Sequence, residues 1–489
     1  MKNYFITEKI RFCLLLSLLI FSFSAASFAQ KPQVRWMYLW NGLRNNQPDE
    51  EMPKGNASFQ ILERKAKINK TTQLIPVNQR EWILSDGWEL SASERLIESG
   101  ESLFDPELNT QNWLNAIVPG TVLTTLVDQG IYPDPYFGLN NLSIPDTLCR
   151  MDWWYRIVFE TPELSDNKQY RLLFNGINYR AEVFLNETKL GNIDGAFIRG
   201  KFEVTDLIKK SEKNVLVVHI FPPNNPGIPH EQSMKAGQGL NGGQLCLDGP
   251  TFICSEGWDW MPGIRDRNIG IWQDVRLTAS DKVVLSDPQI ITELSSDYKQ
   301  AKITIHADIQ NTSSQSVSGN LVFNMDEHVE IKQPYQLSPN ESRTVTLSPE
   351  NHSGLIVENP RLWWPNGYGE QHLYHAELKV FTGKNELSDS RKIRWGIREM
   401  SYELMAHVSD KNQRFAYSPV RTIKNGKPIF DYINRKYYDE EIQIPTLYPD
   451  ADVSGLEELS NDDPIGAYLV IRVNGVRIFC RGGNWGMDD

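Results

Sequence analysis

The clearest pattern along the chain is an alternation of apolar and polar residues with a period of two. Residues 301–309 alternate strictly, and residues 374–380 repeat the pattern. This alternation is typical of a half-buried strand, in which successive side chains point to opposite faces. Shorter strands are predicted over Tyr170–Phe174, Ala181–Leu185 and Val215–Ile220, with Asn and Gly turn residues between them.

Helical periodicity is scarce. The best helix candidate is Thr121–Asp128, which follows Pro119-Gly120, carries apolar residues on one face and stops before Gly130. Many short strands with few helices favour β-sandwiches and jelly rolls. The sequence therefore predicts a mainly β protein.

The strands group into two units. One β domain fits residues 76–283 and a second, smaller one fits residues 284–400, with Ser286-Asp287-Pro288 at the boundary. Residues 30–75 are polar and aperiodic and are predicted to be an irregular lead-in. Residues 431–465 are rich in Asp, Glu, Tyr and Pro and show poor periodicity.

Residues 1–29 have the pattern of a secretory signal peptide. Basic residues precede the apolar stretch Phe12–Phe23, and small residues follow up to Ala29. The stretch is shorter than the roughly 18 residues that a membrane-spanning helix needs. We expect cleavage after Ala29, a secreted or periplasmic protein, and no membrane span.

Composition and charge narrow the function. The 489 residues carry a net charge of -12, which argues against a nucleic-acid partner. With eight His and no Cys-x-x-Cys, neither a metal site nor a cofactor is expected. Cys246 and Cys254 either close a small disulfide loop or remain buried thiols.

An unusual aromatic segment spans residues 256–272. It holds three Trp, two Arg and three carboxylates. Trp faces stack on the C–H patches of sugars, while charged groups hydrogen-bond sugar hydroxyls. The alternative is structural: the Trp pack between sheets, and Arg265 and Arg267 pair with Asp266 or Glu256 to order a long loop. Composition leaves both open.

Two Trp pairs are expected to be structural. Trp153-Trp154 heads a strand, so one ring should enter the core while the other points away. Trp363-Trp364 precedes the strand near residues 374–380 and is expected to pack in a loop.

A series of short motifs along the chain, taken in order, resembles glycoside hydrolase family 2, in its exo-β-glucosaminidase and mannosylglycoprotein endo-β-mannosidase branch. These motifs are Val118-Pro119-Gly120-Thr121, Asp152–Arg156, Phe174-Asn175-Gly176, Ala181–Asn186, Gly257–Trp272, Pro360–Gly367, Trp395–Arg398 and Asn474–Trp485. The resemblance implies a jelly-roll (galactose-binding-like) sugar-binding domain, then an immunoglobulin-like β-sandwich. Residues 401–489 would then open a truncated (β/α)8 barrel.

The resemblance also implies a function. Family members hydrolyse β-mannosides or β-glucosaminides by a retaining mechanism, so a glycan is the expected partner. Trp258 and Asp259 match the loop that reaches the barrel mouth, and Trp260 is expected to pack. Asn484 and Trp485 match the end of the first barrel strand, at the face that carries barrel active sites. The oligomeric state is left open.

No catalytic residue can be assigned. The family's acid/base Glu stands in an Asn-Glu pair late in the barrel, whereas Asn186-Glu187, Asn340-Glu341 and Asn385-Glu386 all fall in the accessory domains. A complete barrel needs about 250 residues. We therefore expect a fragment that is inactive alone, and the alternative is a non-catalytic secreted carbohydrate-binding protein.

One feature departs from the family pattern. The family has a single Asn-Gly hairpin before the barrel, whereas this chain has two similar motifs, at Asn425-Gly426 and Asn474-Gly475. Both are predicted to be hairpin turns.

Overall fold

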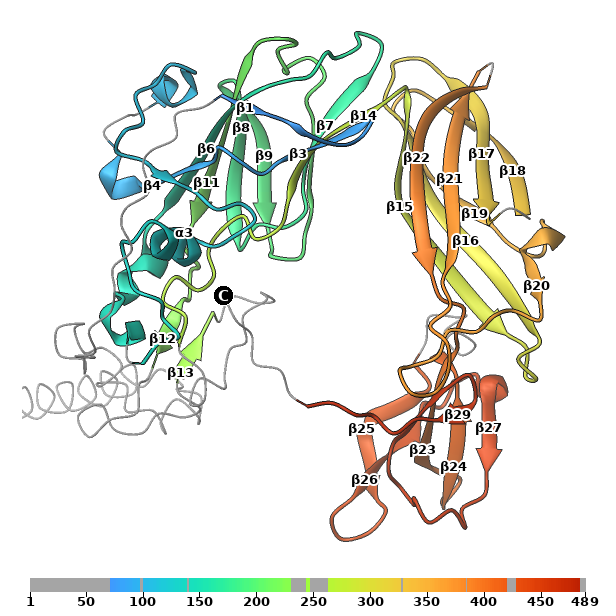
Figure 1. The fold of residues 1–489 in the computed structure, drawn as a ribbon. Coiled ribbons are helices and arrows are strands. Elements are labelled where there is room, and N and C mark those ends of the chain that lie inside the picture. The colour runs from blue at the N-terminus through green and yellow to red at the C-terminus, as the bar shows by residue number, and fades with distance from the viewer. Residues whose placement is uncertain are drawn as a thin grey trace, which may run out of the picture. The chain divides into compact units, whose positions relative to one another are not determined.

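The structure is a computed structural model and is mainly β, as the alternation predicts (Figure 1). It describes residues 71–96, 100–138, 140–229, 243–246, 263–326, 329–383, 385–419 and 428–483. Its contacts divide the chain into two compact units at residue 277, and residues 165–170 belong to the second unit. Within the described ranges, no helix has the length and apolarity to cross a membrane.

The first unit is a jelly-roll domain built on two main sheets. One has the strand order β5-β4-β6-β11-β8-β9 with β1 beside β6, and the other has the order β10-β7-β14-β3-β2. A two-stranded β12-β13 ribbon accompanies them. The strands are β1 Thr72–Gln73, β2 Ile75–Asn78, β3 Glu81–Leu84, β4 Glu89–Ala92, β5 Leu114–Asn115, β6 Trp153–Glu160, β7 Gln169–Phe174, β8 Arg180–Leu185, β9 Thr188–Asp194, β10 Gly200–Glu203, β11 Lys213–Phe221, β12 Gly227–Pro229, β13 Gly243–Leu245 and β14 Val275–Ser280.

Short helices connect these strands. They are η3 Ser93–Arg95, η4 Gly100–Phe104, α3 Val122–Asp128, η5 Asn140–Ser143 and η6 Asp146–Arg150. The predicted helix is confirmed as α3, whose cap residue Thr121 accepts a hydrogen bond from the backbone N–H of Thr124. The side chain of a Thr at this position satisfies one of the open N–H groups of the first turn.

The Trp pair at the head of β6 behaves as predicted. Trp153 is buried, while Trp154 points the other way and stacks on His219 with 3.9 Å between ring centroids. The Trp154 indole N–H also donates to the Ser93 hydroxyl at 2.8 Å. Both rings are therefore part of the packing.

The second unit begins with an immunoglobulin-like sandwich. Its two sheets have the orders β15-β16-β19, with β20 beside β16, and β18-β17-β21-β22. The strands are β15 Val283–Leu294, β16 Gln300–Asn311, β17 Val317–Met325, β18 Val329–Leu337, β19 Ser342–Leu347, β20 Ile356–Glu358, β21 Tyr374–Thr382 and β22 Glu386–Trp395, and the helix η8 is Ser353–Leu355. The alternation predicted over residues 301–309 is confirmed in β16, because its apolar residues enter one buried core.

Two details near the predicted domain starts differ from the sequence prediction. β1, Thr72–Gln73, pairs with β6 in parallel although it lies within the predicted irregular segment. Ser286-Asp287-Pro288 lies inside β15 at a break in register, not between domains. Proline cannot donate to a strand ladder, so strands accommodate it at bulges, and a bulge resembles a loop when only the sequence is seen.

Trp363 and Trp364 pack structurally, as predicted. The backbone N–H of Trp363 donates to the carbonyl of Ile397 at 2.8 Å, and the Arg398 guanidinium lies 4.6 Å from the centre of the Trp363 ring.

Residues 400–483 form a further sheet with the order β25-β26-β23-β24-β27, and β28 joins it beside β23. Its elements are β23 Met400–Val408, β24 Lys411–Tyr417, β25 Phe430–Tyr437, β26 Gln443–Leu447, η10 Val453–Gly455, β27 Leu456–Leu459, β28 Val470–Val473 and β29 Val476–Arg477. It has a small core of its own: Leu404, Ala406, Phe415, Ile429 and Phe430. The barrel expected from residue 401 onward stays a prediction.

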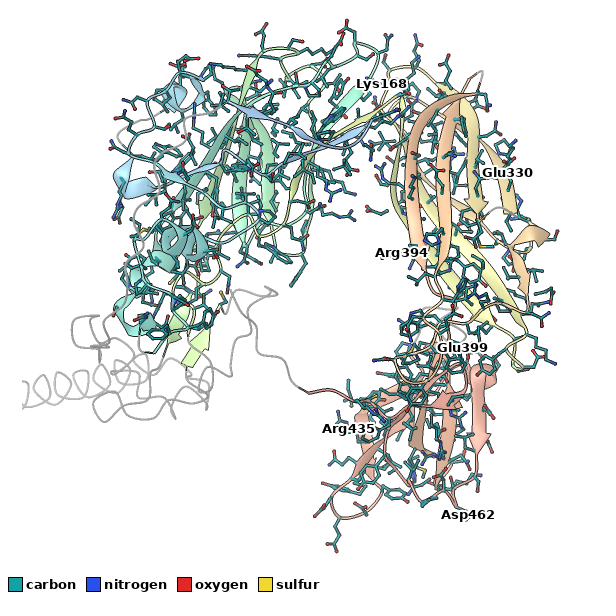
Figure 2. All side chains as sticks on the ribbon, in the orientation of Figure 1. Lys168, Glu330, Arg394, Glu399, Arg435 and Asp462 are labelled. Atoms are coloured by element: carbon teal, nitrogen blue, oxygen red, sulfur yellow. The ribbon has the colours of Figure 1, made fainter. Side chains whose placement is uncertain are left out.

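The second Asn-Gly motif is a hairpin turn, as predicted. Asn474 and Gly475 both have positive φ, and β28 pairs with β29 across them. The Asn474 side chain donates to the Trp363 carbonyl at 3.0 Å and accepts from the Glu399 N–H at 2.9 Å; Glu399 is labelled in Figure 2. The hairpin is thereby tied to the immunoglobulin-like domain. The motif at Asn425-Gly426 lies outside the described residues.

Candidate functional site

The four residues predicted to contact sugar lie outside the described residues. These are Trp258, Asp259, Asn484 and Trp485, and their role stays a prediction. The structure describes the chain again from Gly263, so it includes the C-terminal part of the aromatic segment. We call residues 263–272 the stem.

Arg267 is the buried centre of the stem. Its guanidinium donates to the Pro226 carbonyl at 2.7 Å, the Ile264 carbonyl at 2.7 Å and the Gly227 carbonyl at 3.3 Å. It also forms an ion pair with Asp146 at 2.7 Å. Burial lowers the pKa of Arg267, but Asp146 outweighs this effect, so the pKa is raised overall. One side chain thus joins the stem to η6 and to the start of β12.

The ion pairs of the stem differ from those expected. Arg267 pairs with Asp146 rather than with Asp266. Asp266 instead accepts from the backbone N–H of Leu123 at 2.6 Å and of Asn268 at 2.8 Å. Leu123 lies in the first turn of α3, where backbone N–H groups have no partner within the helix. The charged groups of the stem do make ordering contacts, and the ion-pair partner seen for Arg267 is Asp146, which lies far away in the sequence.

A second set of bonds fixes the stem to the turn between β7 and β8. The Asn178 amide donates to the carbonyls of Arg267 and Asn268, both at 3.0 Å. The backbones of Asn178 and Gly270 exchange hydrogen bonds at 2.9 and 3.1 Å. The stem is therefore held both by the Arg267 contacts and by the turn between β7 and β8.

Gly270 is a point where this base tolerates no side chain. Its φ is +156°, and an added Cβ would lie 2.5 Å from the Gly120 carbonyl oxygen and 2.8 Å from the Thr121 Cα. We expect Gly270→Ala to destabilise the first unit by about 1–3 kcal/mol, as overpacking typically does. Urea unfolding measures this.

The matched control is Gly100→Ala. Gly100 also has positive φ (+61°), but nothing lies within 4 Å of its added Cβ. Gly100→Ala therefore measures the cost of an alanine at positive φ without a clash, and equal losses for the two variants would contradict the clash.

The described part of the site offers no reactive thiol. Cys149 is buried beside the Asp146 carbonyl, and burial raises the pKa of its thiol to about 11. A thiol in that state is protonated at neutral pH and is a poor nucleophile. Cys246 is also buried, and its proposed partner Cys254 lies outside the described residues. Among the described residues, no group of His, Cys, Asp and Glu side chains could hold a metal ion.

Two of the three Asn-Glu pairs, Asn186-Glu187 and Asn385-Glu386, lie at hairpin turns, and Asn340-Glu341 lies in the connection between the two sheets of the immunoglobulin-like sandwich. Asn186, Asn340 and Asn385 all have positive φ and lie between or at the ends of paired strands. Around Glu341, hydrogen bonds from Ser338 and Arg343 lower the pKa of the carboxyl. A general acid in glycoside hydrolysis needs a raised pKa, so this Glu has the opposite electrostatic setting.

The jelly-roll domain also holds a polar pocket of about 340 Å³. The buried ion pair of Arg156 and Glu89, 3.0 Å apart, lies in its wall. Arg156 donates further to the carbonyls of Leu103 and Asp105, and Glu89 accepts from Thr110. These groups satisfy one another, so the pair serves to hold the 104–110 segment against the sheet.

Sequence comparisons match two family models. Residues 88–273 match the model described as glycosyl hydrolase 2 galactose-binding domain-like, and residues 283–398 match that of glycosyl hydrolases family 2. The two matched ranges correspond to the jelly-roll domain with the stem and to the immunoglobulin-like sandwich. The resemblance drawn from the sequence motifs is confirmed.

Individual relatives agree with these matches. Mannosylglycoprotein endo-β-mannosidase of Lilium longiflorum is 35% identical over 338 residues, covering 65% of this chain and 34% of that protein. Exo-β-D-glucosaminidase of Streptomyces avermitilis is 26% identical over 323 residues, covering 65% and 32%. The solved structure of Amycolatopsis orientalis exo-chitosanase CsxA has a TM-score of 0.53 at 25% identity, covering 68% of this chain and 35% of that one. The chain thus spans about a third of the length of these relatives.

Proposed function

Because the chain belongs to glycoside hydrolase family 2, we propose that its β domains serve a secreted glycosidase acting on β-linked mannosyl or glucosaminyl residues. In such an enzyme the bond is cleaved with retention by two carboxyl groups about 5–5.5 Å apart. Neither group is assigned to this chain. Its contribution is to hold the sugar.

The observation that carries this proposal is the match of two consecutive family 2 domains. Their relatives include a mannosidase and a glucosaminidase, which is why both sugars are proposed. The stem around Arg267 supports this proposal because its hydrogen bonds and ion pair fix the point at which the segment containing Trp258 and Asp259 joins the described fold. We assign that contact to Trp258 and Asp259, with Asn484 and Trp485 as the second pair.

The chain on its own is expected to release no nitrophenol from 4-nitrophenyl β-mannoside or β-glucosaminide. The physical reason is that its Asn-Glu pairs sit in turns and strand connections of the accessory domains. The protein is collected from the periplasm or medium, where mass spectrometry should find Gln30 as its first residue. Turnover that follows the chain through size-exclusion chromatography would contradict the inactivity.

Binding is measured on the same material by calorimetry with mannose, glucosamine and their oligomers. Asp259→Ala is expected to weaken binding by about 10-fold or more, since a hydrogen bond to a charged group contributes about 1.5–3 kcal/mol. Asp462→Ala, which removes an exposed carboxylate of the C-terminal sheet (Figure 2), is the control and should change nothing. Binding without turnover is also the result expected of a non-catalytic carbohydrate-binding protein. A heat of binding that Asp259→Ala leaves unchanged would refute the assigned contact.

A further inference from the structure

The β25–β26 hairpin forms one edge of the C-terminal sheet and exposes a long run of side chains (Figure 1). Among the described strands, β25 pairs only with β26. Every residue from Tyr432 to Glu441 is exposed. The run includes Ile433, which is 86% exposed, and Tyr437, which is 68% exposed. Large apolar side chains gathered on an open strand edge are typical of a surface that contacts another molecule.

The charged residues of this hairpin are arranged symmetrically about Tyr438. Lys436 and Arg435 stand two and three residues before it, and Glu440 and Glu441 stand two and three residues after it. The basic residues belong to the strand β25, whereas the acidic residues belong to the turn that leads into β26. Each hairpin therefore has a basic section followed by an acidic tip.

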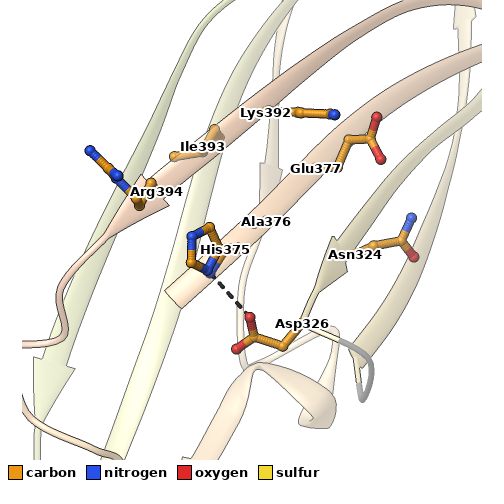
Figure 3. A pocket seen from close by; sticks show the side chains of 8 residues that line it. All are labelled: Asn324, Asp326, His375, Ala376, Glu377, Lys392, Ile393 and Arg394. Carbon is orange, nitrogen blue, oxygen red and sulfur yellow. Dashed lines mark hydrogen bonds between the residues drawn. The ribbon is translucent and has the colours of Figure 1, made fainter. Parts of the chain in front are cut away.

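Exposed carboxylates in the immunoglobulin-like domain show how such groups find partners within the chain. In the hollow at the ends of β17, β21 and β22, Asp326 accepts from the backbone N–H of His375 at 3.2 Å, which is the dashed line in Figure 3. Glu377 of the same hollow pairs with Lys379 at 2.7 Å. The carboxylates of this hollow are therefore already engaged.

The charged side chains of the hairpin lack such partners. In the described part of the chain, no hydrogen bond or ion pair engages the side chains of Lys436, Glu440 and Glu441. Arg435, which is labelled in Figure 2, donates from Nε to the Tyr432 carbonyl at 2.5 Å, and its guanidinium lies 5.9 Å from the centre of the Tyr432 ring. Neither contact brings a carboxylate to Arg435. The hairpin thus presents two cations and two carboxylates to solvent.

A second copy of the same hairpin supplies the missing partners. An antiparallel contact about a two-fold axis at Tyr438 sets Lys436 of each copy opposite Glu440 of the other. The same axis sets Arg435 opposite Glu441. Opposite charges that face each other across strands stabilise a contact, and like charges destabilise it. A parallel alignment sets like charges together, so the charges select the antiparallel one.

The tyrosines lie at the centre of this contact. Tyr437 and Tyr438 adjoin the axis, so the contact removes the apolar surface of their rings from water. Asp439 serves the turn instead, because its carboxylate accepts from the backbone N–H groups of Glu441 at 2.9 Å and of Ile442 at 2.7 Å. The rings therefore contribute affinity, while the charges set the orientation.

We propose that the β25–β26 hairpin binds a second copy of this chain through an antiparallel two-fold contact centred on Tyr438. Such a contact uses one surface patch on both copies, as symmetric dimers do. The hairpin lies beyond the residues that the two family models match. The contact is independent of the sugar site assigned to the jelly-roll domain.

Sedimentation velocity of the intact chain should show a monomer–dimer equilibrium that shifts toward monomer as salt is raised, because salt screens exposed charges. Arg435→Glu/Lys436→Glu makes the hairpin wholly acidic, and Glu440→Lys/Glu441→Lys makes it wholly basic. Each variant alone should dimerise at least about 10-fold more weakly, because like charges then face each other. An equal mixture of the two should form a heterodimer at least as tightly as the intact chain dimerises. Misfolded variants would not recover on mixing.

The matched control is Glu457→Lys/Glu458→Lys, which makes the same charge change at exposed positions of β27, the opposite edge of the same sheet. It should dimerise as the intact chain does. A chain that stays monomeric at every concentration would overturn the second copy as the occupant. Dimers that neither hairpin variant weakens would overturn the role of the hairpin, and variants that fail to associate on mixing would overturn the antiparallel alignment.

Discussion

Arg267→Ala is expected to lower the free energy of unfolding of the first unit by about 3–5 kcal/mol, the range for breaking a buried ion pair. The substitution leaves the Asp146 carboxylate without its buried partner. It also removes the hydrogen-bond donor of the Pro226, Ile264 and Gly227 carbonyls, each of which accepts from the guanidinium. Urea unfolding, with hydrogen exchange followed on peptides of the stem, measures the loss.

Asp146 supplies the control for this experiment. Its other oxygen contacts Arg150 at 3.5 Å, and the Arg150 side chain is 49% exposed, against 0% for Arg267. Arg150→Ala should therefore cost less than about 1 kcal/mol, as exposed ion pairs do. Arg267→Lys should recover little, since an ammonium group cannot reproduce a planar fork of five donors. Similar losses for the two alanine variants would show that burial is not the cause.

The second large effect is expected at Glu403 in the C-terminal sheet. This carboxylate is fully buried and accepts from Arg414 at 2.9 Å and from Arg477 at 2.8 Å. Arg472 also contacts it, and Arg477 continues to Asp463. Arg472 and Arg477 lie directly opposite each other in the β28–β29 hairpin. Like charges in that position repel, so Glu403 is what allows them to coexist.

Glu403→Gln is therefore expected to cost the second unit about 3–5 kcal/mol in urea unfolding, because it leaves three arginines facing one another. The control is Glu330→Gln. Glu330 pairs with Lys332 at 2.9 Å on the surface, and its side chain is 58% exposed. That variant should change stability by less than about 1 kcal/mol. A Glu403 variant as stable as the control would mean that the arginines are neutralised by other groups.

The same cluster predicts a pH dependence. Burial raises the pKa of Glu403, but hydrogen bonds from Arg477 and Arg414 and the charge of Arg472 outweigh it, so the pKa is lowered overall. A carboxyl with a lowered pKa in the folded state contributes its stability above the unfolded value, about 4.3. That contribution falls as pH drops below about 4 and through the folded pKa. The unmodified chain should lose this stability in acid, and Glu403→Gln should show a smaller loss over the same range.

Local patterns identified the elements that depend on neighbours in sequence. The alternation over residues 301–309 predicted β16, the Thr121 signal predicted α3, and Asn474-Gly475 predicted the β28–β29 turn. β23 and β25 were missed. β23 is buried along most of its length and β25 is exposed along most of it, so neither alternates. A strand with two similar faces leaves no period for the sequence to display.

The stem depends on contacts that the sequence does not display. Asp146 gave no signal as a partner of Arg267, because the two residues lie 121 positions apart in the chain. The sequence offered Asp266 or Glu256 as partners only because they are near, and nearness in sequence says little about which charged groups share a buried space.

The sequence by itself determined that this is a mainly β protein with two family 2 domains in order, since short-range periodicity and ordered motifs depend only on local residues. Only the tertiary structure decided which charges meet. Glu403 and Arg477 are 74 positions apart, and strand pairing brings them to 2.8 Å. Burial makes this ion pair important for stability, because a charged group that is removed from water destabilises the fold unless it has a partner of opposite charge.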